Sequence, residues 1–239
     1  HIWVMRLDRL QREKTILRSN VSVPGRPGKA TEIYKETSDT YVEVTDDLRF
    51  LKNGSFLLTS ERSGWNHIIL HDPTGTAGRA LTAGPWDVID VRGVDEARKR
   101  VIFAAARNSP LGQEIWAVGF DGKGLQQLSP EGGHNDADFN KDFTYFINTR
   151  STANEPEVVT LHSGTGKLLK TLKDNSKLRN TLAPYALQPK TFFTLPANGQ
   201  QLDAWIIKPV GFDANKKYPV LMTQYSGPNS QQVLDKWGI

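Results

Sequence analysis

The stretch Ser55-Phe56-Leu57-Leu58-Thr59-Ser60-Glu61-Arg62 is an apolar strand that runs into a polar turn, and it sets a pattern for the middle of the chain. Similar apolar runs return around Ile102 and Phe146. Aligning these two residues with Phe56 gives spacings of 46 and 44 residues, which match the roughly 40–50-residue period of a four-stranded propeller blade. Because one four-stranded sheet cannot bury both of its faces alone, such blades stack around a channel. The repeat therefore predicts a β-propeller.

Three further elements per repeat complete each predicted blade. The second strands are expected at residues 66–71, 114–118 and 157–161, and the third at 79–82, 125–128 and 168–172. The fourth element is the segment before each first strand, at 41–44, 88–91 and 136–139. Strands at 2–7 and 14–17 and a hairpin loop at 24–28 are assigned to an earlier blade. The prediction is a mainly β protein with about three full blades plus part of another.

After Asn175 the pattern changes. Residues 178–187 hold no clear strand and are interpreted as a short linker. Apolar strands at 190–195 and 202–209 then flank Asn198-Gly199, a dipeptide that is typical of a two-residue hairpin turn.

A third strand is expected at 218–224, and a helix is expected to begin after Pro228 with Asn229 or Ser230 as its N-cap. Three strands of this kind are how an α/β-hydrolase sheet begins. We therefore expect two domains, part of an N-terminal propeller at 1–186 and the start of an α/β-hydrolase domain at 187–239.

The amino-acid composition excludes several classes of function. The 239 residues are 38% hydrophobic and 23% charged, as in a globular protein. The absence of cysteine excludes disulfides and thiolate catalysis. The net charge of +4 comes from scattered basic residues, which indicates a solvated surface rather than a nucleic-acid interface. No apolar run approaches the roughly 20 residues of a membrane helix.

Three patterns that resemble cofactor or metal motifs fail on spacing. Residues 164–167 read Gly-Thr-Gly-Lys but lack the flanking residues of a phosphate loop, and the Asp-rich run at 136–140 lacks the glycine and glutamate of a calcium loop. His67 and His71 on one strand would lie about 13 Å apart, too far for one zinc ion. No cofactor and no metal site are predicted.

The end of the chain carries a specific motif. Lys216-Lys217-Tyr218-Pro219 is followed by Tyr225-Ser226-Gly227-Pro228-Asn229-Ser230-Gln231. This order, together with residues 63–68, 82–88 and 172–178, resembles dipeptidyl peptidase IV and its relatives in the prolyl oligopeptidase family. The resemblance covers nearly the whole chain and implies an internal fragment of a longer protein, here called the parent.

The resemblance implies a serine exopeptidase that removes N-terminal dipeptides, Xaa-Pro or Xaa-Ala, from peptides with a free N-terminus. The propeller would restrict entry, and Tyr225 would donate its phenol to the oxyanion of the tetrahedral intermediate. A phenol, whose reference pKa is about 10, is a neutral donor near pH 7, and losing one oxyanion donor typically costs about 10²–10³ in rate. The family also implies a periplasmic, cell-envelope or secreted location and leaves open a homodimer of the full-length parent.

Several expected parts are missing from the sequence. There is no Gly-x-Ser-x-Gly nucleophile elbow and no Glu-Glu dipeptide to hold a substrate ammonium. We therefore expect the 239-residue chain alone to be inactive. Two other interpretations stay open for the parent: a non-catalytic peptide- or protein-binding scaffold, or a related acylaminoacyl peptidase or prolyl endopeptidase. Tyr225 itself could instead be a strand-end residue in a packing role.

Three arginines end the equivalent strand of successive predicted blades, namely Arg62, Arg107 and Arg150. We expect a repeated turn contact or salt bridge at these positions. The alternative is that one of them reaches the central cavity and contacts substrate.

Overall fold

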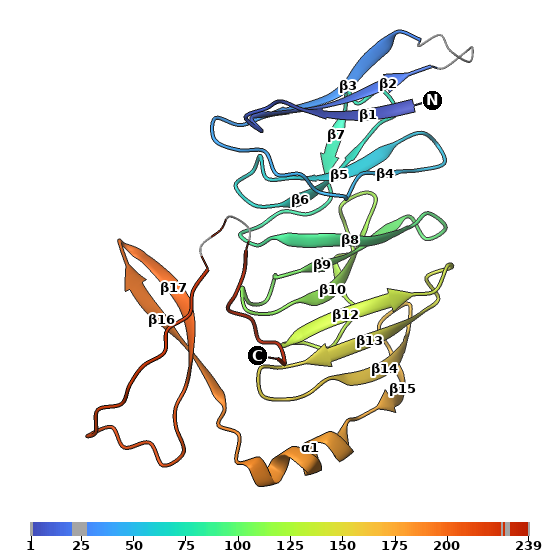
Figure 1. Ribbon diagram of the computed structural model, residues 1–239. Coiled ribbons are helices and arrows are strands. Elements are labelled where there is room, and N and C mark those ends of the chain that lie inside the picture. The colour runs from blue at the N-terminus through green and yellow to red at the C-terminus, as the bar shows by residue number, and fades with distance from the viewer. Residues whose placement is uncertain (1, 21–27, 226, 228–229, 239) are drawn as a thin grey trace. The chain divides into compact units, whose positions relative to one another are not determined.

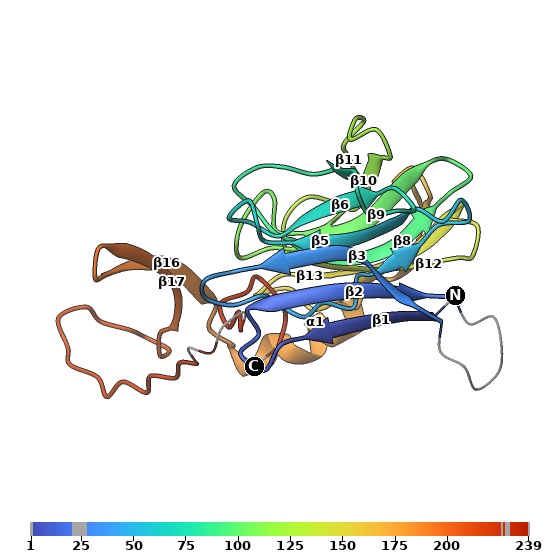
Figure 2. The same ribbon diagram turned by 90° about the horizontal axis from the view of Figure 1, so that it is seen from above.

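The computed structural model describes residues 2–20, 28–225, 227 and 230–238, which form two compact units. The first unit contains residues 1–107 and 116–126, and the second contains 108–115 and 127–239. The chain starts with a three-stranded antiparallel sheet of β1 (Ile2–Leu7), β2 (Glu13–Ser19) and β3 (Ala30–Thr37). These three strands lie side by side in Figure 2. The predicted strands at 2–7 and 14–17 are confirmed, whereas β3 was not predicted and the loop at 24–28 lies almost wholly outside the described residues.

Three four-stranded sheets follow, and each is built from consecutive antiparallel strands (Figure 1). The first holds β4 (Arg49–Phe50), β5 (Phe56–Ser60), β6 (His67–His71) and β7 (Gly78–Ala80). The second holds β8 (Val88–Asp95), β9 (Arg100–Ala105), β10 (Glu114–Gly119) and β11 (Gln126–Gln127). The third holds β12 (His134–Phe139), β13 (Tyr145–Ser151), β14 (Val158–Ser163) and β15 (Leu168–Lys173). The predicted repeat of four-stranded blades is thus confirmed.

One predicted blade strand is wrong. Residues 41–44 form no strand, and β4 lies further along at Arg49–Phe50. The backbone N–H of Val42 donates to the Gln11 carbonyl at 2.7 Å, and the Lys14 ammonium donates to the Glu43 carbonyl at 3.3 Å. These bonds tie the segment to the turn between β1 and β2, so its backbone does not join the next sheet.

The apolar runs of the sequence form the central strands of the sheets, where side chains on both faces of the strand are buried. All five residues of β5 are buried, as are five of the six residues of β9. Leu57, Phe103 and Trp116 share one cluster of buried side chains, and Phe56 joins a second cluster with Ile16 and Tyr34. Burial on both faces explains why these strands read as continuous apolar runs rather than alternating ones.

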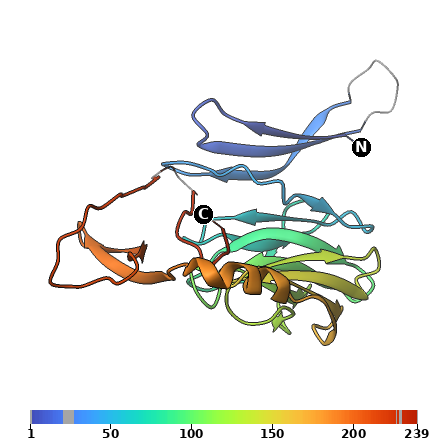
Figure 3. The ribbon, with the colours of Figure 1, turned by 60° about the horizontal axis from the view of Figure 1, so that its bottom comes forward.

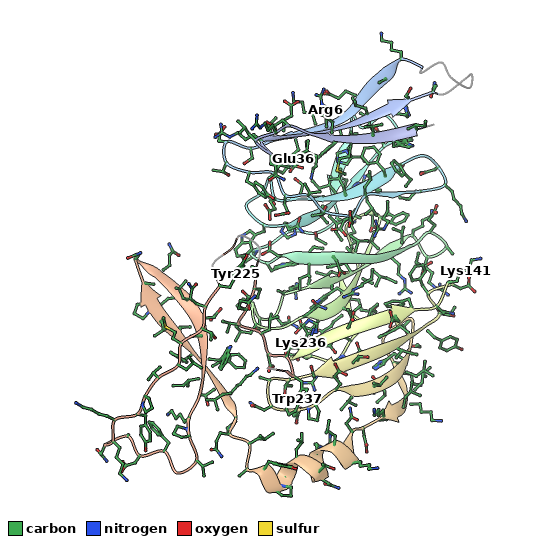
Figure 4. All side chains as sticks on the ribbon, in the orientation of Figure 1. Arg6, Glu36, Lys141, Tyr225, Lys236 and Trp237 are labelled. Atoms are coloured by element: carbon green, nitrogen blue, oxygen red, sulfur yellow. The ribbon has the colours of Figure 1, made fainter. Side chains whose placement is uncertain are left out.

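A buried polar network around Glu36, which Figure 4 labels, links the first two sheets of the first unit. The Glu36 carboxylate accepts hydrogen bonds from the Ser60 hydroxyl and, at 2.8 Å, from the Tyr34 hydroxyl. The Lys14 ammonium lies 3.2 Å from Glu36, and both side chains are less than a tenth exposed. Burial alone would raise the pKa of Glu36, but the Ser60 hydrogen bond and the Lys14 charge hold it below its ordinary value.

The linker after β15 is partly helical, which was not predicted. Helix α1 (Ser176–Leu182) and a single 3-10 turn η1 (Ala183–Tyr185) carry the chain from β15 to the hairpin of β16 (Lys190–Ala197) and β17 (Gln200–Ile207), as Figure 3 shows. The helix buries no side chain, so it lacks the apolar stripe that reveals a helix in a sequence. Asn198 and Gly199 join the hairpin strands with positive φ values of 49° and 79°, as a type I′ turn requires.

The predicted strand at 218–224 is not present. These residues pair with no described strand, and Val220, Leu221 and Met222 are more than four-fifths exposed. An apolar run becomes a strand only when another strand satisfies its backbone hydrogen bonds. The predicted helix start at Pro228 and Asn229 lies outside the described residues, and residues 230–238 form no helix.

Candidate active-site tyrosine and its anchoring

Tyr225 lies in the irregular segment that follows β17 (Figure 4). Its side chain is 64% exposed, and its hydroxyl has no hydrogen-bond partner in the described part of the chain. The ring lies over the backbone of Gly227, where an added Cβ would come within 2.6 Å of Cε1 and 3.0 Å of the hydroxyl oxygen. Only a residue without a side chain leaves room for this placement. The structure therefore presents an exposed phenol that folds over a glycine and has no hydrogen-bond partner among the described residues.

The segment after the tyrosine turn is held by two loops of the second unit. The Gln231 side-chain amide donates to the Pro110 carbonyl at 3.2 Å, and the Asp235 N–H donates to the Leu111 carbonyl at 2.7 Å. Pro110 and Leu111 belong to the loop between β9 and β10. The Asp235 carboxylate also accepts the N–H of Ala153 at 2.7 Å.

Further bonds join the end of β13 and the loop that follows it to the start of β16 and to residues after Tyr225. The Trp237 N–H donates to the Ser151 hydroxyl at 3.2 Å. The Asn154 side chain accepts the N–H of Lys190 at 2.8 Å and donates to the Lys190 carbonyl at 3.1 Å. The Lys190 ammonium in turn donates to the Gly238 carbonyl at 2.7 Å. One loop thus holds the start of β16 and the residues that follow the tyrosine turn.

Two of the three arginines make the turn contacts expected of them, and for Arg107 the expectation is wrong. Arg62 donates to the hydroxyls of Tyr34 and Ser60, and Arg150 donates to the Gly132 carbonyl at 3.0 Å. Arg107 instead lies over the rings of Trp116 and Trp86, at 4.9 and 5.9 Å from their centroids. Its guanidinium makes no hydrogen bond or ion pair with any residue that the structure describes.

Two hydroxyl–imidazole pairs are close enough to suggest a nucleophile, but their surroundings exclude the role. In the first, Thr82 Oγ1 lies 3.0 Å from His67 Nδ1, and both residues are only 4% exposed. In the second, Thr160 Oγ1 lies 2.9 Å from His162 Nε2. The His162 ring is 3% exposed, is stacked on Phe146 at 4.9 Å and has its other nitrogen 3.1 Å from the Gly166 carbonyl. A substrate has no access to either pair, and the second is part of the core of the third four-stranded sheet.

The described residues hold no group of three or more His, Cys, Asp or Glu side chains that could bind a metal ion. No helix in the same residues is long and apolar enough to cross a membrane. The anchoring residues Asp235, Asn154 and Lys190 were not identified from the sequence. Each is a single polar residue outside any motif, and its partner lies 36 to 124 positions away along the chain.

Blades of consecutive antiparallel strands, followed by a helix and a hairpin, define part of a β-propeller protein with an attached second segment. Residues 1–157 match the family model described as the dipeptidyl peptidase IV (DPP IV) N-terminal region. The chain belongs to the dipeptidyl peptidase IV family.

Solved and curated relatives extend the similarity beyond residue 157. A crystal structure of Porphyromonas gingivalis dipeptidyl peptidase 4 superposes with a TM-score of 0.90 and 38% identity, over 99% of this chain and 33% of that one. Dipeptidyl peptidase 4 of Trichophyton rubrum is 31% identical over 182 residues, which are 74% of this chain and 24% of that protein. The dipeptidyl peptidase 4 of Arthroderma otae is 31% identical over 183 residues, again 74% and 24%. The chain therefore spans about a quarter to a third of the length of these relatives.

Proposed function

We propose that the chain is part of a serine exopeptidase that removes N-terminal dipeptides, Xaa-Pro or Xaa-Ala, from peptides with a free N-terminus. The observation that carries the proposal is the family membership combined with the exposed phenol of Tyr225, whose hydroxyl has no hydrogen-bond partner among the described residues. A hydroxyl that bonds to none of the described residues is available to donate to a substrate atom.

In this proposal Tyr225 donates its phenol hydrogen to the carbonyl oxygen of the scissile bond. Negative charge develops on that oxygen when a serine attacks the carbonyl carbon, and a fixed donor aimed at the oxygen lowers the barrier. The propeller restricts entry, so that folded proteins are excluded and peptides or unstructured termini are admitted.

The remaining catalytic groups lie in the parent outside this sequence. The nucleophile elbow is absent from the 239 residues, so we expect the isolated chain to hydrolyse no peptide. We further propose that the parent is periplasmic, attached to the cell envelope or secreted. A homodimer of the parent is compatible with this proposal. The family membership supports these proposals.

The proposed function can be tested by incubating the parent with two matched peptides. One peptide has a free N-terminus and proline at its second position, and the control is the same peptide with an acetylated N-terminus. We expect mass spectrometry to detect an Xaa-Pro dipeptide from the free peptide only. Cleavage of both peptides would indicate an endopeptidase or acylaminoacyl peptidase instead. Binding of the peptide without cleavage would indicate a non-catalytic scaffold.

A further inference from the structure

The loop between β13 and β14 connects two segments that are far apart in the sequence. Its Asn154 side chain makes both hydrogen bonds of a strand-like pair with the backbone of Lys190, at the start of β16. Its Ala153 N–H and the preceding Ser151 hydroxyl bind Asp235 and Trp237, which follow the tyrosine turn. Propeller residues therefore hold the catalytic-domain segment on both sides of Tyr225.

Asp235 is the central member of this arrangement (Figure 4 labels its neighbours Lys236 and Trp237). Its N–H and its carboxylate bind two different loops, each at 2.7 Å. The bond from Ala153 has a charged acceptor, and such bonds are shorter and stronger than neutral ones. Asp235 makes no ion pair within the described residues, so its charge has no other described role.

The anchored residues after the turn lie close to Tyr225 in the sequence, so they can restrict where its side chain lies. Gln231, the first anchored residue after the turn, is six residues from Tyr225, a span of at most about 20 Å. Asp235 follows Gln231 by four residues and is held by both loops. The anchors that follow the turn therefore limit how far Tyr225 can move away from the two propeller loops.

We propose that Asp235 is a positioning residue for Tyr225, through which two propeller loops fix the oxyanion donor. The proposal rests on the proposed function of Tyr225. It assigns to the propeller a role in the rate of the chemical step, in addition to any role in restricting entry.

The test is a double-mutant cycle in the full-length parent, measured by steady-state release of p-nitroaniline from Gly-Pro-p-nitroanilide. Asp235→Ala removes the acceptor for the Ala153 N–H, and we expect kcat to fall about tenfold, as for loss of one hydrogen bond to a charged group. KM should change little, because Asp235 does not touch substrate. Asp235→Asn keeps an acceptor oxygen and should recover much of kcat.

The same substitution in a Tyr225→Phe background separates an effect on the position of the Tyr225 hydroxyl from a general disturbance of the fold. A ring without a hydroxyl has no donor to misplace, so Asp235→Ala should then cost little further activity. Asp121→Ala is the matched control, because its carboxylate accepts the N–H of Lys123 within its own turn and binds no other loop that the structure describes.

The outcomes are distinguishable. An equal loss from Asp235→Ala in both backgrounds, or no loss in either, would overturn the positioning role and leave the proposed function standing. An inactive wild-type parent, or an unchanged kcat for Tyr225→Phe, would contradict the proposed function and the positioning role together.

Discussion

Gly227 carries much of the local geometry around Tyr225. The tyrosine ring occupies the space that a side chain at position 227 would fill, with Cε1 only 2.6 Å from the place of a Cβ. Cβ atoms essentially never approach another atom so closely, so either the ring or the turn must shift when a side chain is added. The ring moves more easily, because it is the free end of an exposed side chain.

We therefore expect Gly227→Ala in the parent to lower kcat by displacing the phenol, while KM and the thermal midpoint change little. The expected size lies below the effect of removing the hydroxyl, which is about 10²–10³ for an oxyanion donor. Steady-state kinetics on a Gly-Pro anilide, together with a thermal melt, would check this. A kcat equal to that of the wild type would show that the ring does not need its place over Gly227.

At the scale of single residues, the sequence identified Tyr225 but not what surrounds it. A short motif was enough to find the tyrosine. The requirement for Gly227 depends on where the ring folds back, and the anchor at Asp235 depends on loops that the chain forms more than 80 residues earlier. Gly227 stands in the same motif, but its contact with the ring is not readable from the order of residues, and the Asp235 anchor has no local pattern at all.

Among the elements, the pair Lys14 and Glu36 links strands β2 and β3, and the Ser60 bond extends the link to β5. Removing one partner of a buried ion pair leaves an uncompensated charge, which costs about 3–5 kcal/mol. We expect Glu36→Gln to lower the free energy of unfolding by about this amount, because Lys14 stays buried.

An exposed pair in the same sheet provides the control. Glu13 lies 2.7 Å from Lys35, but both side chains are about a third to a half exposed, and water screens such pairs. Denaturant unfolding of Glu13→Gln should match the wild type. If Glu36→Gln also matched it, the buried network would contribute nothing to stability.

His71 on β6 makes the stability of the folded chain depend on pH. Its ring is stacked on Phe56 at 5.0 Å and meets the edge of Tyr34 at 5.1 Å. Burial, and then the charge of Arg62, lower the pKa of His71, while the Gly75 backbone and the carboxylates of Asp72 and Glu36 oppose the shift.

The unfolded chain therefore binds a proton at His71 more readily than the folded chain does. The contribution of a neutral His71 to stability is complete above the unfolded pKa of about 6.5 and is lost as the pH falls through the folded pKa. We expect the thermal midpoint to fall between pH 7 and pH 5, and to fall less in His71→Phe, whose ring can occupy the same stack. Identical pH profiles for the two proteins would contradict this account.

The elements that the sequence predicted well are those that depend on burial alone. Continuous apolar runs marked β5, β9 and β10, and the Asn-Gly turn marked the β16–β17 hairpin. The failures depend on partners: β4 is a two-residue strand that was placed too early, and the apolar run at 218–224 lacks a neighbouring strand. Helix α1 has no buried face, so no periodicity revealed it.

For the whole molecule, the 44–46-residue period was sufficient to predict a partial propeller, because stacking blades is the main way for such sheets to bury their faces. The sequence could not supply a complete catalytic site, since the chain spans only 24–33% of its relatives' lengths. What the chain does contain is one candidate catalytic side chain and the propeller loops that hold the segment around it.

The most direct test of the account compares the full-length parent with its Tyr225→Phe variant on Gly-Pro-p-nitroanilide. The account predicts a fall in kcat of about 10²–10³ with little change in KM, because the hydroxyl acts on charge that develops only in the transition state. Equal kcat values for an active parent and its variant would contradict it and leave Tyr225 with a packing role.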